Sequence, residues 1–388
     1  MEKVRYGIIG LGNQGSTYIK EFFNKGKIKD AVITALCDCN HDKIEYAKEY
    51  TAGQDIKFFT DYREMLDSGL VDAVLIETPH YFHPEMAMAC FERNIHVLVE
   101  KPAGVYAKQV EEMNVAAGKA KSLFGMMFNQ RTNCVYRKMR EMIANGEIGD
   151  LQRVVWIITD WFRPNAYYAS GSWRATWKGE GGGVLINQCP HQIDLLQWVI
   201  GKMPKNVSAH CKYGKWHDIE VEDDVTAYFE YDNGATGVFI TTTGEFPGAN
   251  RLEISGTKGK LLCENDTIRF YKLSEDIVEF SAKNTVFFGR PDVTEIPVET
   301  DGLNLNHIGI INNFTQAVLG KEELFVSGVE GINGVQIMNA IEYSGWHNGE
   351  KVEIPVNSEK YLAELEEKKK KSKDKNVKDK VADTTGTY

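Results

Sequence analysis

Three glycines near the start of the chain constrain its fold more than any other feature. Gly10, Gly12 and Gly15 are spaced as G-x-G-x-x-G and directly follow a short apolar run that is typical of a β-strand. The first glycine permits a tight turn, the second lets a phosphate approach the main chain, and the third lets a helix pack closely on the strand. The N–H groups and the positive dipole end of that helix then face the phosphates. The motif therefore predicts a dinucleotide-binding turn, to which Asn13 and Gln14 also belong.

Asp38 indicates which dinucleotide this turn binds. It ends the second predicted strand, about 20 residues after Gly15, where sheets of this kind hold the adenosine ribose. A carboxylate at this position accepts both ribose hydroxyls of NAD and repels the 2′-phosphate of NADP. Neither Cys39 nor Asn40 supplies the cation that a 2′-phosphate would need. We therefore predict NAD as the cofactor.

The first 130 residues alternate short β-branched runs with helical stretches, which is the pattern of a parallel sheet with crossover helices. The predicted strands are 5–9, 31–37, 57–59, 73–77, 96–99 and 122–127, and the predicted helices are 16–24, 41–49, 62–67, 84–92 and 107–119. This order predicts a doubly wound α/β (Rossmann) domain over residues 1–130.

From residue 150 the pattern changes to consecutive strands joined by hairpins. The predicted strands are 224–231 and 235–243 around an Asn233-Gly234 turn, then 252–255, 260–264, 267–273 and 351–355, with helices at 191–200, 308–319 and 331–344. Residues 131–358 are therefore predicted to form an α+β domain on a largely antiparallel, open sheet that binds substrate. We expect the lysine-rich residues 359–388 to form a disordered tail, and the removal of residues 368–388 to change little.

Composition excludes several classes of function. Lys and Arg number 45 against 55 Asp and Glu, a net charge of −10, which is unfavourable for binding nucleic acid phosphates. The seven cysteines include no C-x-x-C pair, so neither structural zinc nor a disulfide framework is expected, and we predict no metal. No apolar run approaches the roughly 18–20 residues that span a bilayer. We expect a cytoplasmic protein without a membrane partner.

Polar residues follow two predicted strands at the edge where ligands bind such sheets. They are Thr78, Pro79, His80 and His83 after the fourth strand, and Glu100 and Lys101 after the fifth. His80 and His83 either contact the nicotinamide side of the cofactor or begin the next helix. Lys101, fixed by the proline that follows it, is a candidate for the reaction itself, and the neighbouring Glu100 offers a carboxylate to a ribose or to the lysine amine.

These motifs, together with the segment GGGVLINQCPHQIDLL at residues 181–196, resemble the glucose–fructose oxidoreductase, inositol dehydrogenase and rhizopine catabolism (Gfo/Idh/MocA) family over about residues 3–356. The resemblance implies NAD(P)-dependent oxidation or reduction of sugars and cyclitols, and homo-oligomers formed through the open sheet. It also implies that Lys101 and His191 flank the reacting carbon. Many inositol dehydrogenase-like members have an aspartate where this chain has Asn187. The variant around Asn187 resembles the branch that acts at the 3-hydroxyl of hexoses.

Oxidation of a secondary alcohol needs a base for the hydroxyl proton. The intrinsic pKa of a histidine suits His191 to this role, and Lys101 would stabilise the developing alkoxide. Asn187 would orient the imidazole by a hydrogen bond but, unlike a carboxylate, would take up no proton. The alternative for His191 is a core position under Trp198, and for Asp194 it is a structural role.

Aromatic residues crowd the stretch before the glycine-rich segment, and residues 163–178 are predicted to form a binding loop. Strand alternation places Trp156 in the core instead. The candidate substrate contacts are Trp161, Arg163, Tyr168, Trp173, Trp177 and His307, and further cofactor contacts are Asn129 and Arg174. Arg174 has either role, and Asn129 and His307 are alternatively capping or packing residues.

Three functions remain open at this point. The leading one is NAD-dependent oxidation of a secondary hydroxyl, at the 3-position, of a hexose, glycoside or nucleotide-sugar. A nucleotide-sugar would need the cations Arg163, Arg174 and Lys178, whereas the aromatic loop favours an apolar aglycone. The second is a glycoside hydrolase that retains NAD and works through a transient 3-keto sugar. The third is a non-catalytic NAD-binding sensor. The presence of both Lys101 and His191 argues against this function.

Overall fold

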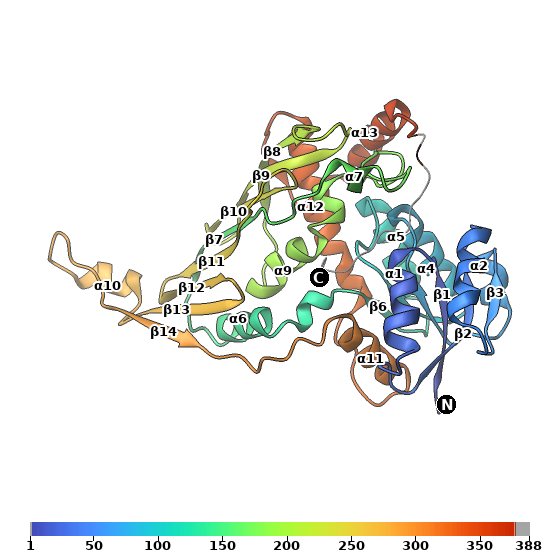
Figure 1. Ribbon diagram of the computed structural model, residues 1–388. Coiled ribbons are helices and arrows are strands. Elements are labelled where there is room, and N and C mark those ends of the chain that lie inside the picture. Colours follow the sequence, from blue (N-terminus) through green and yellow to red (C-terminus); the bar gives the residue numbers. More distant parts are fainter. Residues whose placement is uncertain (1, 376, 378–388) are drawn as a thin grey trace.

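A computed structural model describes residues 2–375 and 377 of the chain, and its N-terminal part contains a six-stranded parallel sheet (Figure 1). Its strands are β1 (Val4–Ile9), β2 (Ala31–Cys37), β3 (Lys57–Phe59), β4 (Ala73–Ile76), β5 (His96–Val99) and β6 (Phe124–Met126). They lie in the order β3-β2-β1-β4-β5-β6. The order reverses between β1 and β4, which is where sheets of this kind bind their ligands. The predicted α/β domain is confirmed.

Helices connect these strands as predicted, with one difference at the start. They are α1 (Asn13–Thr17), η1 (Tyr18–Phe23), α2 (His41–Tyr50), α3 (Tyr62–Asp67), η2 (His80–Phe82), α4 (His83–Glu92) and α5 (Ala107–Ala117). The first helix begins at Asn13, three residues before the predicted start, and continues through η1 as a π-helix. The glycine turn therefore leads directly into a helix N-terminus.

The second sheet has nine strands, and one of its faces is open. Its strands are β7 (Leu151–Ile158), β8 (Asn206–Tyr213), β9 (Glu222–Glu230), β10 (Thr236–Thr242), β11 (Asn250–Gly256), β12 (Gly259–Glu264), β13 (Thr267–Leu273), β14 (Val293–Val298) and β15 (Val352–Glu353). Only the β7–β10 pairing is parallel among the described strand pairs of this sheet. The predicted, largely antiparallel sheet is confirmed.

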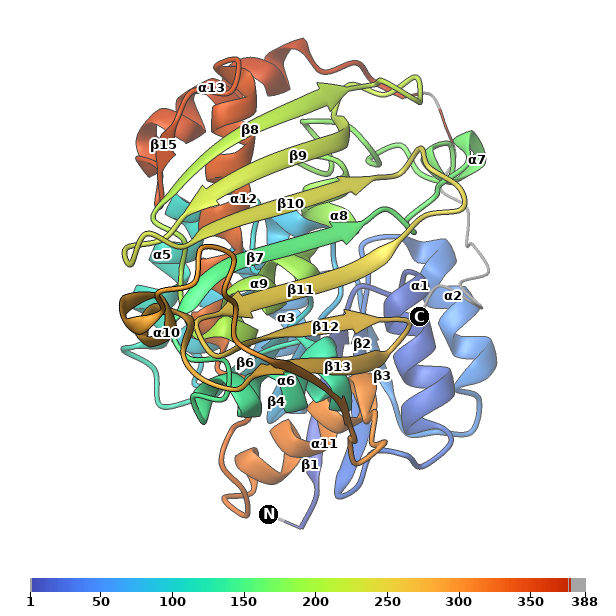
Figure 2. The ribbon, with the colours of Figure 1, turned by 90° about the vertical axis from the view of Figure 1, so that its left-hand side faces the viewer.

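Helices cover the inner face of this sheet. The helices after β6 are η3 (Asn129–Thr132), α6 (Cys134–Ala144), α7 (Asn165–Tyr168), α8 (Val184–Asn187), α9 (Pro190–Ile200), α10 (Ile277–Lys283), α11 (Asn306–Val318), η4 (Gly328–Glu330), α12 (Gly331–Trp346) and α13 (Ser358–Lys371), and only some of them cover this face. In Figure 2, α6, α9 and α12 lie behind the sheet, whose outer face is turned to the viewer. Trp156 on β7 is fully buried on the helix side, as its alternation predicted.

A buried ion pair joins η3 to α9. Arg131 donates from Nε and from its terminal nitrogen to the two carboxylate oxygens of Asp194, each at 2.7 Å. Both side chains are 1% exposed. This two-bond geometry offsets the cost of burying the charges, and it assigns Asp194 the structural role.

The predicted division at residue 131 assigned helix α11 to the second domain. The helix instead packs on the first sheet. Its Thr315 lies 2.8 Å from the hydroxyl of Tyr6 on β1, and the main chain of Ser327 pairs with Gly125 on β6. The chain therefore returns to the first sheet after completing most of the second. A linear domain boundary was wrong here because packing of α11 joins segments about 300 residues apart in the sequence.

The prediction of a disordered tail from residue 359 was also wrong for the described part. Residues Ser358–Lys371 form α13, on which Tyr361 and Leu365 are buried. These two residues are four apart and therefore share one face of the helix. This spacing predicts an amphipathic helix, but the many lysines around it favoured the prediction of disorder. Residue 376 and residues 378–388, the rest of the predicted tail, lie outside the described residues.

The described part of the chain contains no helix that is both long and apolar enough to cross a membrane. Within the same residues, no group of three or more His, Cys, Asp or Glu side chains is placed to hold a metal ion. All seven cysteines are free thiols.

Candidate active site

The glycine turn is built as a cradle. Gly10 has φ of +98°, and a Cβ there would lie 2.5 Å from the carbonyl oxygen of Glu77. A Cβ on Gly15 would overlap the carbonyl oxygen of Gly10, whereas a Cβ on Gly12 would meet nothing within 4 Å. Two glycines are thus required by packing, and the third leaves an open face over the start of α1. This shape fits a pyrophosphate at the helix N-terminus.

Asp38 is tied to this turn at the end of β2. Its carboxylate accepts hydrogen bonds from the main-chain N–H of Leu11 and of Asn40, at 2.8 and 2.9 Å. The amine of Lys43 lies 3.6 Å from the same carboxylate. The two residues that follow Asp38 in the sequence carry no positive charge. The first turn of α2 instead brings the amine of Lys43 to the place where a 2′-phosphate would bind.

Asp38→Ala is expected to narrow the preference for NAD over NADP from at least tenfold to a few-fold. The substitution removes the charge that repels a 2′-phosphate and frees Lys43 to pair with it. Dissociation constants of NADH and NADPH, measured by nicotinamide fluorescence, check this. Asp42→Ala, which removes a neighbouring exposed carboxylate, serves as the control. Equal affinity of the wild-type protein for both cofactors would contradict the assignment of Asp38.

Two buried carboxyl groups lie at the ends of β4 and β5. Glu100 accepts a hydrogen bond from the hydroxyl of Tyr18 at 2.9 Å. Both carboxyl oxygens of Glu77 are buried without a hydrogen-bond partner among the described residues. Burial raises the pKa of Glu100 to about 7, and burial with the nearby Glu100 raises the pKa of Glu77 above its ordinary value. Unpartnered buried oxygens fit the hydroxyl or amide groups of a bound nicotinamide riboside, and Glu77 was missed by the sequence motifs.

The two histidines after β4 have structural partners. The nitrogens of His83 lie 2.8 Å from the carbonyl oxygen of Pro102 and 2.7 Å from that of Thr78. His83 therefore ties the ends of β4 and β5 together, and its side chain is fully buried. His80 lies 3.2 Å from the carbonyl oxygen of Glu180. Both histidines therefore have main-chain partners within the protein, and their contact with the nicotinamide side of the cofactor stays a prediction, as do those of Thr78 and Pro79.

Lys101 reaches from the first sheet to the second domain. Its amine donates to the carbonyl oxygen of Asn187 at 3.1 Å. Burial lowers the pKa of Lys101, while the carboxylates of Glu100 and Glu180 act in the opposite direction. The ammonium group is thus held at the junction of β5 and α8 by a main-chain acceptor.

His191 lies in the first turn of α9, after Pro190. Burial, and then the positive charge of Lys101, lower the pKa of His191 well below its ordinary value. A neutral imidazole is the form that accepts a proton. The expected hydrogen bond from Asn187 is absent among the described contacts: the Nδ1 atom of His191 is buried without a partner, and the Asn187 amide bonds elsewhere.

The predicted binding loop divides into two groups. The guanidinium of Arg163 lies over the rings of Trp161 and Tyr167, at 5.6 and 5.3 Å from their centroids. That of Arg174 lies over Tyr167 and Trp173, at 4.5 and 4.7 Å. These side chains stay together near His80, whose ring meets Trp173 edge-on at 5.9 Å. They remain candidates for binding a ligand.

Tyr168 and Trp177 are core residues instead. The hydroxyl of Tyr168 donates to Thr243 at 2.8 Å, and its ring packs on His217. Trp177 is buried against Tyr213 and Trp346, facing α12. These partners do not support the prediction of the two rings as substrate contacts, because long-range partners that local sequence does not show surround them.

Asn129 and His307 bring α11 to the same region. The Asn129 amide donates to Asn306 and lies 3.4 Å from Nδ1 of His307. Burial and the charge of Lys101 lower the pKa of His307 to about 3. The ring of His307 packs on Tyr18, which bonds to Glu100. His307 thus contacts the tyrosine that donates to Glu100, and Asn129 lies next to His307.

Comparison with known proteins agrees with this arrangement. Residues 4–128 match the model of an oxidoreductase family with an NAD-binding Rossmann fold, and residues 136–262 match the GFO/IDH/MocA C-terminal domain. Myo-inositol 2-dehydrogenase of Thermotoga maritima is 27% identical over 68% of this chain and 75% of its own length. The NAD(+)-dependent scyllo-inositol 2-dehydrogenase of Bacillus subtilis is 25% identical over 91% of this chain and 97% of its own.

Among solved structures, the WlbA dehydrogenase of Chromobacterium violaceum, in complex with NADH and UDP-GlcNAcA, superposes with a TM-score of 0.77. It is 25% identical and covers 92% of this chain and 97% of its own. The two family models together match more than half of the chain and correspond to its two sheets. The chain therefore belongs to the GFO/IDH/MocA family of oxidoreductases, whose N-terminal domain binds NAD.

Proposed function

We propose that this protein oxidises a secondary hydroxyl of a hexose or glycoside, at the 3-position, with NAD as the acceptor. The observation that carries the proposal is the meeting of Lys101 and His191. Lys101, from the first domain, donates to the main-chain carbonyl of Asn187, four residues before His191. The positive charge of Lys101 also lowers the pKa of His191. A localised cation beside a neutral base is what removal of a hydroxyl proton needs.

In the proposed reaction, Nε2 of His191 accepts the hydroxyl proton while the ammonium of Lys101 stabilises the developing negative charge on the same oxygen. The glycine turn and Asp38 would hold NAD, which when bound would supply the acceptor for the hydride. Glu100, which accepts a hydrogen bond from Tyr18, would offer its carboxyl group to a ribose hydroxyl. The 3-position follows from the resemblance of the Asn187 segment to the hexose 3-oxidising branch.

The charges around the loop favour a neutral substrate over a nucleotide-sugar. Arg174 lies 3.6 Å from Glu180, and Lys178 pairs with Asp374 at 3.3 Å. The third candidate, Arg163, covers two aromatic rings and donates to the carbonyl oxygen of Phe162. The two arginines are thus engaged within the protein and Lys178 pairs at the exposed surface, and the rings of Trp161 and Trp173 remain to stack on a sugar or an apolar aglycone.

A substrate panel tests this proposal. Purified protein with NAD is incubated with free hexoses, aryl glycosides and UDP-sugars, and the keto product is trapped with borodeuteride to locate the oxidised carbon. We expect deuterium at C3 of a hexose or aryl glycoside, and at least tenfold lower kcat/KM for UDP-sugars. Faster oxidation of a UDP-sugar would contradict the neutral substrate, and aglycone release without NADH would identify the NAD-retaining hydrolase. Failure to oxidise any of these sugars, with NAD bound, would contradict the proposed function.

We also propose that the protein forms a homo-oligomer. Between β13 and β14 an arm that carries α10 projects from the sheet (Figure 1), and Phe287 and Phe288 on it are fully exposed. Exposed aromatic side chains are enriched at the cores of subunit interfaces. Light scattering of the purified protein measures the assembly.

A further inference from the structure

The carboxylate of Glu180 has no part in the reaction proposed above, yet it lies beside the lysine. It directly precedes the glycine-rich segment and is only 2% exposed. One carboxylate oxygen accepts the main-chain N–H of Ala175 at 2.5 Å, and the other accepts the side-chain amide of Asn187. Both partners are donors, which favours the ionised carboxylate, although burial raises the pKa of Glu180 above its ordinary value.

Glu180 is one of four side chains in a polar ring with Asn187, Tyr167 and Arg174, and Gln188 donates to two of them. The amide oxygen of Asn187 accepts from the hydroxyl of Tyr167 at 3.2 Å. That hydroxyl accepts from Arg174 at 2.8 Å, and the same guanidinium nitrogen lies 3.6 Å from Glu180. Three hydrogen bonds and one ion pair thus connect the four side chains, and a network of buried polar groups fixes the orientation of its members.

This ring touches both parts of the active site. Its Asn187 provides the carbonyl oxygen that holds the amine of Lys101. Its Arg174 and Tyr167 stack with each other in the aromatic loop. The side chain of residue 187 points its amide into the ring rather than toward His191, so its role differs from that of an imidazole-orienting group.

We propose that Glu180 is a positioning residue of the active site, whose carboxylate fixes Asn187 and Arg174 around Lys101 and supplies the negative charge that this chain lacks at position 187. The inference rests on the proposed function, because it assigns Glu180 to the same site. It also explains why an amide serves at position 187: a carboxylate there would face a second carboxylate at hydrogen-bond distance.

The test moves the charge from one position to the other. Glu180→Gln is expected to lower kcat roughly 10- to 100-fold, because it removes the charge and sets an amide donor against the donors of the ring. Asn187→Asp, which opposes two buried carboxylates, is expected to lower kcat to a similar extent. The double variant restores one carboxylate and one amide in exchanged positions. We expect its kcat to return to within tenfold of the wild-type value, with NADH affinity within a few-fold in all variants.

Glu330→Gln provides the matched control, since Glu330 also pairs with a buried arginine, Arg131, but lies outside the ring. Wild-type kcat in Glu180→Gln, or a double variant whose loss equals the product of the single losses, would overturn the inference. Melting temperatures of the same four proteins provide a reading that needs no substrate. If the wild-type protein oxidises no sugar, the proposed function fails, and additive shifts in melting temperature would still refute the ring.

Discussion

Lys101→Met and His191→Ala are each expected to lower turnover about 100-fold or more while leaving NADH affinity within a few-fold of the wild-type value. The first substitution removes the cation that faces the reacting oxygen, and the second removes its base. Neither side chain bonds to the glycine turn or to Asp38 among the described contacts. Because both groups act on one oxygen, the double variant should lose much less than the product of the single losses. Steady-state kinetics and fluorescence titration measure both effects.

The pH dependence of activity in Lys101→Met gives a second test of how Lys101 acts on His191. His191 accepts a proton only when it is neutral, so activity is lost as the pH falls through its pKa. In the wild-type protein Lys101 helps to lower that pKa below the ordinary value near 6.5. Without the lysine charge the pKa rises, and the acidic limb of the residual activity should move to higher pH. His210→Ala, which removes an exposed side chain in the middle of β8, is the control. Near-normal turnover in His191→Ala would move the role of base to another group.

Deletion of residues 358–388 is expected to destabilise the protein by several kcal/mol and to lower its melting temperature by the order of 10 °C. The described part of this segment buries Tyr361 and Leu365, and Tyr361 donates its hydroxyl to Glu342. Its Lys368 lies 4.6 Å from the ring centroid of Trp346. Removal of the helix would expose these groups and leave a buried carboxyl group without its donor.

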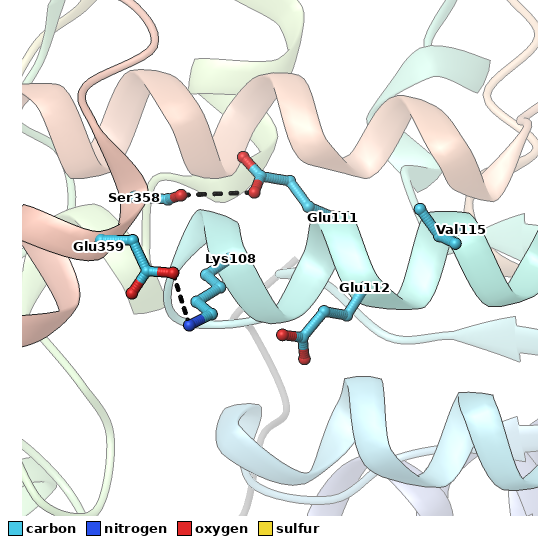
Figure 3. Close-up of a pocket in the computed structure, with 6 residues that line it drawn as sticks. All are labelled: Lys108, Glu111, Glu112, Val115, Ser358 and Glu359. Atoms are coloured by element: carbon cyan, nitrogen blue, oxygen red, sulfur yellow. Dashed lines mark hydrogen bonds and ion pairs between the residues drawn. The ribbon is translucent and has the colours of Figure 1, made fainter.

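The same segment bridges the two domains and the binding loop. Figure 3 shows Glu359 paired with Lys108 of α5 at 2.7 Å, and the neighbouring hydroxyl of Ser358 directed at Glu111. At its other end, Lys375 donates to the carbonyl oxygen of Arg174 at 2.7 Å. We therefore expect the deletion to raise KM as well. Removal of residues 378–388 alone keeps all of these contacts and is the control. Equal melting temperatures of the wild-type and both truncated proteins would show that α13 contributes nothing to stability.

Local patterns in the sequence determined the part of the fold that binds the cofactor. The glycines of the turn act through φ angles and close packing with their immediate surroundings, and Asp38 is placed by the end of its own strand. Strand alternation likewise placed Trp156 in the core. Lys101 and His191 were recognised from short motifs because each motif fixes its own turn. Such signals depend on neighbours within a few residues, and they are visible without the tertiary structure.

Only the tertiary structure decided the partners of buried polar and aromatic groups. Trp177 was predicted to face a ligand, but its neighbours come from strands and helices far along the chain. The partner of Asn187 is Glu180 rather than His191. The lysine-rich segment at the C-terminus packs as a helix, and its Tyr361 donates a hydrogen bond to the buried Glu342. In each case the stabilising free energy of folding comes from burial and hydrogen bonds between segments far apart in the sequence. A sequence pattern indicates the secondary structure that one segment prefers, but not which surface will cover that segment.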